Sequence, residues 1–241
     1  LGASIVVADV NLNSYKEFEF ESRLMTGKSV TEEIEKIGVR TLAIEMDVAN
    51  EESCKQMADQ IIDKFGRIDI VVCNAGGGEG NLTDGYASTL NMEQTQSIMA
   101  RNLYGTVHTC KVVIPYMKKQ GQGKIITVSS VAGLFAKNKG SYAHYSMAKA
   151  GIVSYTRNLA QEIGPYNIQV NCIAPGHIQT GRLNEQFLKK GVEKITATIA
   201  LRRLGSVEDC ANVIEFLATN LSDYVTGQVI PVCGGVVLGP C

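Results

Sequence analysis

Six short runs of apolar residues, rich in β-branched side chains, alternate with helical patterns along this chain of 241 residues. The runs cover residues 5–8, 41–46, 68–73, 124–128, 168–173 and 228–232. Within each run the apolar residues are consecutive rather than alternate, which predicts strands buried on both faces, as in a parallel sheet. Repeated strand–helix units predict an α/β fold in which helices cover both faces of a mostly parallel, doubly wound sheet. We expect residues 1–241 to form a single domain.

The segments between the strands carry signals for helix starts and helix ends. Apolar side chains recur at helical spacing between residues 54 and 65, where Asn50 is placed to cap the start and Gly66 to end the helix. Ser206, followed three residues later by Asp209, resembles a capping box with Asp in place of Glu.

Two segments lack a regular pattern. Residues 11–27 are polar, contain several aromatic side chains and look like an insertion after the first strand. Residues 180–198 predict one or two short helices in a mobile flap, and we expect this substrate flap to extend over about residues 180–203.

Composition narrows the class of partner. The formal net charge is −1 and like charges do not form runs, so bulk electrostatics favour neither a nucleic acid nor a membrane surface. The seven cysteines are scattered without a C-x-x-C pair, which is typical of reduced thiols in a cytoplasmic protein rather than of a metal site or a disulfide framework. No apolar segment approaches the roughly 18 residues of a membrane span. We therefore expect a cytoplasmic protein with no metal site.

Tyr145 and Lys149 lie four residues apart in a helical pattern, so their side chains share one face of the helix. A phenol with a pKa of about 10 is a poor acid or base at neutral pH. A nearby ammonium lowers that pKa and prepares the phenol for general acid–base chemistry on an alcohol or ketone. The same spacing also fits an amphipathic helix with one exposed lysine.

Further candidate residues follow three of the predicted strands. Ser129 and Ser130 follow residues 124–128, Asn74 to Gly76 follow the run at 68–73, and Pro175 to Thr180 follow the run at 168–173. The carboxyl ends of parallel strands are where ligands bind in open α/β sheets. Each motif also fits a plain turn or loop. Asn102 lies in a long helical pattern, where it is either functional or a polar residue that caps a neighbouring backbone segment.

Taken together and in this order, the motifs closely resemble those of the short-chain dehydrogenase/reductase family, from Asp9 to Gly235. The matching segments are Asn-Ala-Gly at 74–76, Asn-Leu-x-Gly at 102–105, Ser-Ser-x-x-Gly at 129–133, Tyr-x-x-x-Lys at 145–149, Pro-Gly-x-Ile-x-Thr at 175–180 and Tyr-Val-Thr-Gly-Gln at 224–228. The resemblance implies a Rossmann-type fold, hydride transfer with a nicotinamide cofactor and a homotetramer.

The resemblance also implies catalytic roles. Tyr145 would exchange a proton with the substrate oxygen, and Ser130 would orient and polarise the substrate carbonyl. Lys149 would lower the pKa of Tyr145 and bind the nicotinamide ribose, while Asn102 would hold a water that relays protons to solvent. We expect the fields of Lys149 and of the oxidised nicotinamide to bring the pKa of Tyr145 towards neutrality.

The implied cofactor site is assembled from several strand ends. Its expected residues are Asp9, Asp47, Val48, Asn74, Ala75, Gly76, Tyr145, Lys149, Pro175, Gly176, Ile178 and Thr180. Asp47 and Val48 would face the adenine, and Ile178 and Thr180 would hold the carboxamide. Asp9 would accept hydrogen bonds from the adenosine ribose. An acid there repels a 2′-phosphate, so NAD is expected rather than NADP.

The substrate pocket is expected in the least patterned segments, at residues 77–82, at residues 134–142 and in the flap after Thr180. Candidate substrate contacts are Gly77, Leu134, Tyr142 and His177. The substrate itself does not follow from these residues.

The family pattern also includes a first strand and a glycine-rich turn about 20 residues before the strand-end acid. Only eight residues precede Asp9 here. That turn would bind the pyrophosphate at a helix N-terminus, and that strand would lie in the centre of the sheet. We expect the printed sequence to be part of a longer chain. The alternative is a natural truncation that has lost or altered dinucleotide binding.

Three functional hypotheses follow. The leading one is an NAD(H)-dependent oxidoreductase that interconverts a small-molecule secondary alcohol and a ketone, with Tyr145 as general acid–base. The second is a 3-oxoacyl-(acyl-carrier-protein) reductase that uses NADPH, against which Asp9 and the near-zero charge argue. The third is a truncated, non-catalytic binding protein with this fold, against which Ser130, Tyr145 and Lys149 argue.

Overall fold

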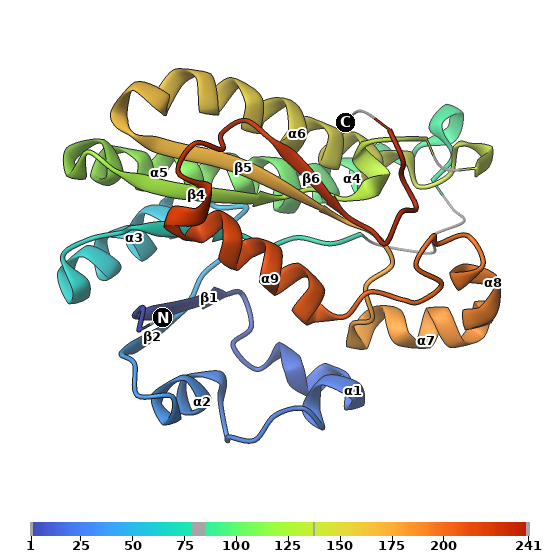
Figure 1. Cartoon of the computed structure of the whole chain (residues 1–241), viewed down its shortest axis with the longest axis horizontal. Coiled ribbons are helices and arrows are strands. Elements are labelled where there is room, and N and C mark those ends of the chain that lie inside the picture. Colours follow the sequence, from blue (N-terminus) through green and yellow to red (C-terminus); the bar gives the residue numbers. More distant parts are fainter. Residues whose placement is uncertain (1, 79–84, 137, 240–241) are drawn as a thin grey trace.

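All six predicted strands are present in the structure, a computed structural model that describes residues 2–78, 85–136 and 138–239 (Figure 1). They are β1 (Ile5–Asp9), β2 (Thr41–Glu45), β3 (Ile70–Cys73), β4 (Gly123–Val128), β5 (Ile168–Pro175) and β6 (Val229–Val232). Every paired strand is parallel to its neighbour. The prediction of a doubly wound, parallel α/β fold is confirmed.

The strands form two separate ladders. β1 pairs with β2, and β3, β4, β5 and β6 pair in that order. Among the described residues, no strand pairing joins β1 to β3, and the side chains of Ile5, Ile70 and Val72 at these edges are 39%, 41% and 38% exposed. Figure 1 shows the β1–β2 pair apart from the four-stranded sheet.

Helices cover both faces of the four-stranded sheet. One face packs against α3 (Glu51–Phe65), α5 (Gly105–Gln120) and α6 (Ala143–Ile163) through a buried cluster centred on Ile125, Val170 and Met117. The opposite face packs against α9 (Val207–Ala218) through Ile126, Ile173 and Leu217. A third cluster, with Ile44 and Met57, packs α3 against the β1–β2 pair. Because α3 contributes to two clusters, it links the two ladders.

The predicted helix boundaries are confirmed. The Asn50 side chain accepts a hydrogen bond from the Ser53 N–H, and Gly66 ends α3 with a φ of 77°. Ser206 and Asp209 form the capping box at the start of α9: the Ser206 hydroxyl accepts from the Asp209 N–H, and the Asp209 carboxylate accepts from the Ser206 N–H. These contacts satisfy backbone donors that the first turn leaves without an intrahelical partner.

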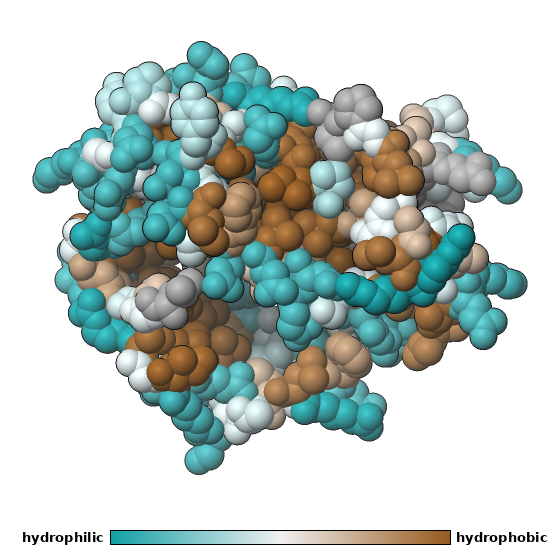
Figure 2. All heavy atoms as spheres, in the orientation of Figure 1, coloured by the Kyte–Doolittle hydropathy of each residue, from teal (hydrophilic) through white to brown (hydrophobic). Residues whose placement is uncertain are grey.

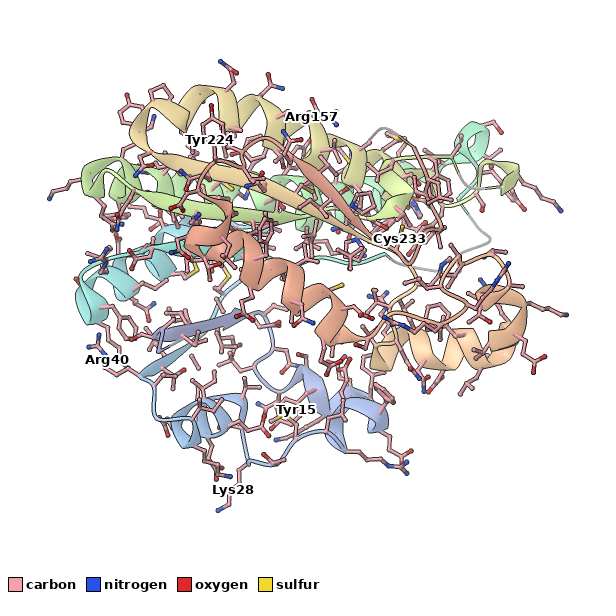
Figure 3. All side chains as sticks on the ribbon, viewed as in Figure 1. Tyr15, Lys28, Arg40, Arg157, Tyr224 and Cys233 are labelled. Atoms are coloured by element: carbon pink, nitrogen blue, oxygen red, sulfur yellow. The ribbon has the colours of Figure 1, made fainter. Side chains whose placement is uncertain are left out.

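The insertion at residues 11–27 contains η1 (Ser14–Glu17) and α1 (Glu19–Ser22) and precedes α2 (Val30–Lys36). Its two ends are tied together by Tyr15, whose hydroxyl donates to the Lys28 carbonyl at 2.9 Å (Figure 3). The segment predicted as a flap contains α7 (Gly181–Lys190) and α8 (Val192–Thr196), which agrees with the prediction of one or two short helices. Its role as a substrate flap stays a prediction.

One long helical pattern is interrupted in the structure. α4 (Met92–Met99) passes into a π-helical segment, η3 (Ala100–Tyr104), which continues as α5. Such π-turns inside helices occur frequently at functional sites. The remaining short elements are 3₁₀ turns: η2 (Ala87–Thr89), η4 (Val131–Gly133), η5 (Asn138–Gly140), η6 (Gly164–Tyr166) and η7 (Asn220–Ser222).

The surface shown in Figure 2 is polar over most of its area, with apolar atoms gathered over β6 and over the β1–β2 pair. At each of these places a ladder ends in a strand that pairs with no further strand among the described residues. Within the described ranges, no helix has both the length and the apolar character needed to cross a membrane.

Candidate active site

The predicted motifs meet at one edge of the sheet, because parallel strands end on the same side. Asn74 follows β3, Ser129 follows β4, and Pro175 is the last residue of β5. The parallel register pairs Cys73 with Thr127 and Val128 with Ile173, so these strand ends are neighbours. The carboxyl edge of the sheet therefore holds the candidate site.

Helix α6 is fixed to β4 at the level of Lys149 by buried polar contacts. The Ser129 hydroxyl donates to the Lys149 carbonyl at 2.7 Å. The hydroxyls of Thr127 and Thr156 are hydrogen-bonded at 2.6 Å, and both side chains are fully buried. Gly133 packs directly on the α6 backbone at Lys149. Buried, satisfied hydrogen bonds of this kind hold the helix in one position on the sheet.

Lys149 is a buried cation, only 4% exposed. Its Nζ donates to the Val128 carbonyl at 2.8 Å. Burial lowers the pKa of Lys149 to about 8, because the charged amine loses water on leaving solvent. The side chain is therefore held at the end of β4, directly beside the tyrosine one turn earlier in α6.

Substitution of Lys149 is expected to change how stability depends on pH. The pKa of this lysine is lower in the folded protein than in the unfolded chain, so wild-type stability should rise as pH increases from about 8 to about 10.5. Below pH 8, we expect the free energy of unfolding of Lys149→Met to exceed that of wild type by the largest amount. This difference should shrink by pH 10. Urea unfolding at pH 7 and pH 10 measures it.

Lys111 provides the matched control. Lys111 is exposed and paired with Glu51. The free energy of unfolding of a Lys111→Met variant should therefore differ from that of wild type by the same amount at both pH values. If the unfolding free energies of Lys149→Met and wild type differ by the same amount at pH 7 and pH 10, the interpretation of Lys149 as a buried cation is wrong.

Tyr145 lies beside Lys149, with the Lys149 Nζ 5.6 Å from the centre of the phenol ring. Burial and the neighbouring Tyr142 raise the pKa of Tyr145 to about 12, while a hydrogen bond from Ser130 and the charge of Arg182 act to lower it. Lys149 alone therefore does not bring the pKa of Tyr145 towards neutrality, and the expected combined effect with the oxidised nicotinamide stays a prediction. The physical reason is that the Lys149 ammonium is directed at the Val128 carbonyl, and desolvation of the phenolate dominates.

Asn102 lies in the π-turn η3 and is fully buried. Its side-chain oxygen accepts from the Gly77 N–H at 2.9 Å, and its side-chain nitrogen donates to the carbonyls of Gly77 and Ile98 at 3.0 and 2.9 Å. The amide thus caps the loop after β3, which is the structural role that the sequence left open. The expected role in a proton relay stays a prediction.

The loop after β3 is built for close approach by a ligand. We call Gly76 to Gly78 the glycine loop. Gly76 and Gly77 have φ of 143° and 140°, which favours glycine. A Cβ on Gly76 would lie 2.5 Å from the Asn102 Oδ1 and 3.6 Å from the Lys149 Nζ. The absence of side chains in the glycine loop lets Asn102, Arg182 and Tyr142 pack directly against its backbone. Its contact with a cofactor stays a prediction.

The other predicted cofactor residues lie along the same edge. Asp9 ends β1, and its carboxylate accepts from the Asn11 N–H at 2.9 Å. Asp47 accepts from the Ala49 N–H, and Val48 packs where Gly105 has no side chain. Of the residues after β5, Ile178 is buried against Gly205, Gly176 packs against Cys233, and Thr180 is the N-cap residue of α7. Their cofactor contacts remain predictions.

Tyr142 is the predicted substrate residue that the structure places beside Tyr145, with ring centres 5.0 Å apart. It is buried and has a φ of 62°, an uncommon conformation for a bulky residue that often marks a functional site. Gly77 lies in the glycine loop. Leu134 follows η4 at the end of β4. Residues 79–82 and 137 of the expected pocket lie outside the described residues.

His177 turns towards another part of the surface. Its ring lies 5.9 Å from that of Phe187, and it lines a shallow hollow together with Arg203, Asp209 and Cys233, the last of which is labelled in Figure 3. Its expected contact with substrate stays a prediction. Among the described residues, no group of three His, Cys, Asp or Glu side chains could hold a metal ion.

Sequence reasoning missed two residues at this edge. Glu21 caps α7 from the insertion, and Arg182 reaches the glycine loop from α7. Ser129, which the sequence placed at the end of a buried strand, ties β4 to α6. Glu21 and Arg182 make contacts 160 and 104 residues away along the chain, for which the sequence gives no local signal.

Comparison with known proteins agrees with this geometry. A family model described as enoyl-(acyl carrier protein) reductase matches residues 20–237. The chain is 45% identical over 235 residues to a cyclohexanol dehydrogenase of Rhodococcus sp. (strain TK6), covering 98% of this chain and 87% of that protein. It is 33% identical over 237 residues to a 3-oxoacyl-(acyl-carrier-protein) reductase of Thermotoga maritima, covering 98% and 89%.

A solved structure is similarly close. The 7 alpha-hydroxysteroid dehydrogenase complexed with NADH and 7-oxo glycochenodeoxycholic acid superposes with a TM-score of 0.83 at 33% identity, covering 97% of this chain and 84% of that one. A doubly wound sheet with serine, phenol and buried amine at its carboxyl edge defines an oxidoreductase. The chain belongs to the short-chain dehydrogenase/reductase family.

Proposed function

We propose that this chain is an NAD(H)-dependent oxidoreductase that interconverts a secondary alcohol and a ketone. The observation that carries the proposal is the arrangement of three side chains. The Lys149 amine lies 5.6 Å from the centre of the Tyr145 ring, and the Ser130 hydroxyl acts to lower the pKa of that tyrosine. The name of the relative that is 45% identical, a cyclohexanol dehydrogenase, supports an alcohol as substrate.

Each side chain has a defined task in this proposal. When bound, the nicotinamide supplies or accepts the hydride. Tyr145 exchanges the proton with the substrate oxygen, and the Ser130 hydroxyl orients that oxygen. In this structure burial raises the pKa of Tyr145 to about 12, so the phenol is protonated at neutral pH but is a weak acid. Its strength as the acid in ketone reduction depends on the cations beside it. Lys149 holds positive charge beside the phenolate that forms.

A preference for NAD over NADP is expected from Asp9. Its carboxylate at the end of β1 would repel a 2′-phosphate. We expect Asp9→Ala to lower the ratio of kcat/KM with NAD to that with NADP by about tenfold or more, because removal of one close like charge is worth roughly 1–2 kcal/mol. Initial rates with both cofactors measure the ratio.

Glu45 is the matched control for Asp9, because the parallel register pairs these two acids across β1 and β2. Glu45→Ala removes a strand-end carboxylate of the same pair and should leave the cofactor ratio within twofold. An unchanged ratio in Asp9→Ala would count against NAD selection by this residue.

The substrate class is tested with the complete protein. Cyclic alcohols, polyols, hydroxysteroids and β-keto esters are offered with NAD, NADP and the reduced cofactors. We expect the largest kcat/KM for a cyclic secondary alcohol with NAD. A larger value for a β-keto ester with NADPH would favour the carrier-protein reductase. Absence of turnover with every pair would favour the non-catalytic binding protein.

The quaternary structure and location are also proposed. Met92, Tyr104 and Met147 expose 62%, 51% and 50% of their surface along α4, η3 and α6, the elements near Asn102 and Tyr145. Apolar side chains on these helices support the expected homotetramer, which light scattering on the complete protein tests. The free thiols among the described residues support the expected cytoplasmic location.

A further inference from the structure

Arg182 joins the substrate flap to the glycine loop. It lies in the first turn of α7, and its guanidinium donates to the Gly78 carbonyl. Its Nη1 lies 2.9 Å from the position that a Cβ on Gly77 would take. A single side chain therefore spans from the flap to the loop that follows β3.

The glycine loop transmits this contact to the centre of the site. On one side, the Asn102 amide holds both the N–H and the carbonyl of Gly77. On the other side, the Tyr142 hydroxyl lies against Gly78, so close that a Cβ there would overlap it. Tyr142 in turn lies 5.0 Å from Tyr145, ring centre to ring centre. Arg182 is thus linked to the proposed acid–base residue through three contacts, with Gly78 and Tyr142 between them.

The charge of Arg182 reaches the same two phenols. It acts to lower the pKa of Tyr142 and of Tyr145, against the opposing effect of burial. The other groups around the pair are the Lys149 amine over the Tyr145 ring, the Ser130 hydroxyl, Arg101 near Tyr142, and the His144 ring in contact with Tyr142. Of the three cations named here, Lys149, Arg101 and Arg182, it is Arg182 that lies in the flap.

We propose that Arg182 is a positioning residue that fastens the flap to the glycine loop and brings a second cation, besides Lys149, to Tyr145. The position of the flap and the protonation of the phenol are then coupled, because the charge is near the tyrosine only when the flap is fastened. This inference rests on the proposed function, in which Tyr145 exchanges the substrate proton.

Glu21 supplies a control that separates fastening from charge. Its carboxylate accepts from the Gly181 N–H at 3.0 Å and holds the same first turn of α7 from the opposite side, through the insertion. Glu21→Gln weakens this support without removing a cation from the tyrosine pair. Arg182→Met removes both the fastening and the charge, whereas Arg182→Lys keeps the charge.

The first measurement is cleavage of the flap by the glutamate-specific protease Glu-C, which cuts after Glu185 and Glu193 in α7 and α8. None of the Arg182 substitutions creates or removes a site for this protease. We expect flap peptides to appear at least threefold faster from Arg182→Met and from Glu21→Gln than from wild type. Unchanged rates in Arg182→Met would overturn the fastening role.

The second measurement is the pH profile of kcat/KM for alcohol oxidation at saturating NAD. The phenolate is the base in this direction, and a cation stabilises it, so loss of the cation should raise the pH midpoint by about half a unit or more. Below the midpoint, kcat/KM should then fall by roughly threefold or more. We expect this shift in Arg182→Met and the wild-type midpoint in Arg182→Lys. Glu21→Gln should also stay near the wild-type midpoint, because Arg182 still fastens the flap in that variant. A threefold rise in cleavage needs only a small rise in the open population, which leaves the average charge near Tyr145 almost unchanged.

The outcomes separate this inference from the proposed function. If wild type oxidises no alcohol with NAD, the proposed function itself is wrong. If wild type is active and Arg182→Met keeps the wild-type midpoint, or Arg182→Lys shifts as far as Arg182→Met, the coupling is overturned. Should Arg182→Met fail to accumulate as folded protein, Arg182→Gln is measured in its place against the same outcomes.

Discussion

Tyr145→Phe is expected to reduce kcat for alcohol oxidation by on the order of a thousandfold while leaving dinucleotide affinity within a few fold. The change removes one hydroxyl from a half-buried ring and keeps the packing against Tyr142, 5.0 Å away between ring centres. General acid–base catalysis by a positioned side chain contributes roughly 10²–10⁴-fold. Steady-state kinetics at saturating cofactor measure the first quantity, and quenching of protein fluorescence on cofactor titration measures the second.

Tyr224→Phe is the control for loss of a phenol in general. This tyrosine is fully exposed, at 104%, and lies at the turn before β6 (Figure 3), so its hydroxyl should be dispensable. Turnover close to wild type in Tyr145→Phe would disprove the acid–base role. A parallel loss of cofactor affinity would instead show that the phenol acts in binding the dinucleotide.

The positions of the strands along the chain could be predicted because their signal is local. Each buried strand is a run of consecutive apolar residues, as at Ile125 and Ile126, which face opposite helix layers. The caps at Asn50 and Ser206 also depend on residues only three apart. Such features follow from the chain's own sequence, whatever the rest of the fold does.

The electrostatics of the site could not be predicted, because they depend on burial and direction. The spacing of Tyr145 and Lys149 predicted a lowered tyrosine pKa, yet the amine donates to Val128 and burial raises that pKa. Arg182 acts on the same phenol from a helix 37 residues further along the chain. A motif thus identifies which groups take part, whereas their protonation depends on long-range packing.

The hydrogen bonds of Asn102 could not be predicted from the sequence either. Its position in the family motif implied a proton relay, and the structure adds three backbone contacts, to both polar groups of Gly77 and to Ile98. These contacts arise from a π-turn between α4 and α5, which the continuous helical pattern of the sequence does not reveal. The residue therefore supports the glycine loop whether or not it also relays protons.

Gly133→Ala is expected to be the most damaging small substitution in the site. A Cβ at this position would lie 2.6 Å from the carbonyl carbon of Lys149 and 2.8 Å from the Ala150 nitrogen, so only movement of α6 backbone could relieve the clash. Overpacking typically costs about 1–3 kcal/mol, and contact with backbone rather than with a flexible side chain favours the upper end. Urea unfolding measures the loss.

The same displacement should separate Ser130 from Tyr145, because η4 directly follows Ser130 and packs on α6 at Lys149. We therefore expect kcat of the folded fraction to fall by at least tenfold, in addition to the lost stability. Gly164→Ala is the matched control: this glycine has a helical φ of −51°, and a methyl group added there would have no neighbouring atom within 4 Å. It should be neutral or slightly stabilising. Equal effects of the two substitutions would show that the close contact between η4 and α6 does not position the catalytic pair.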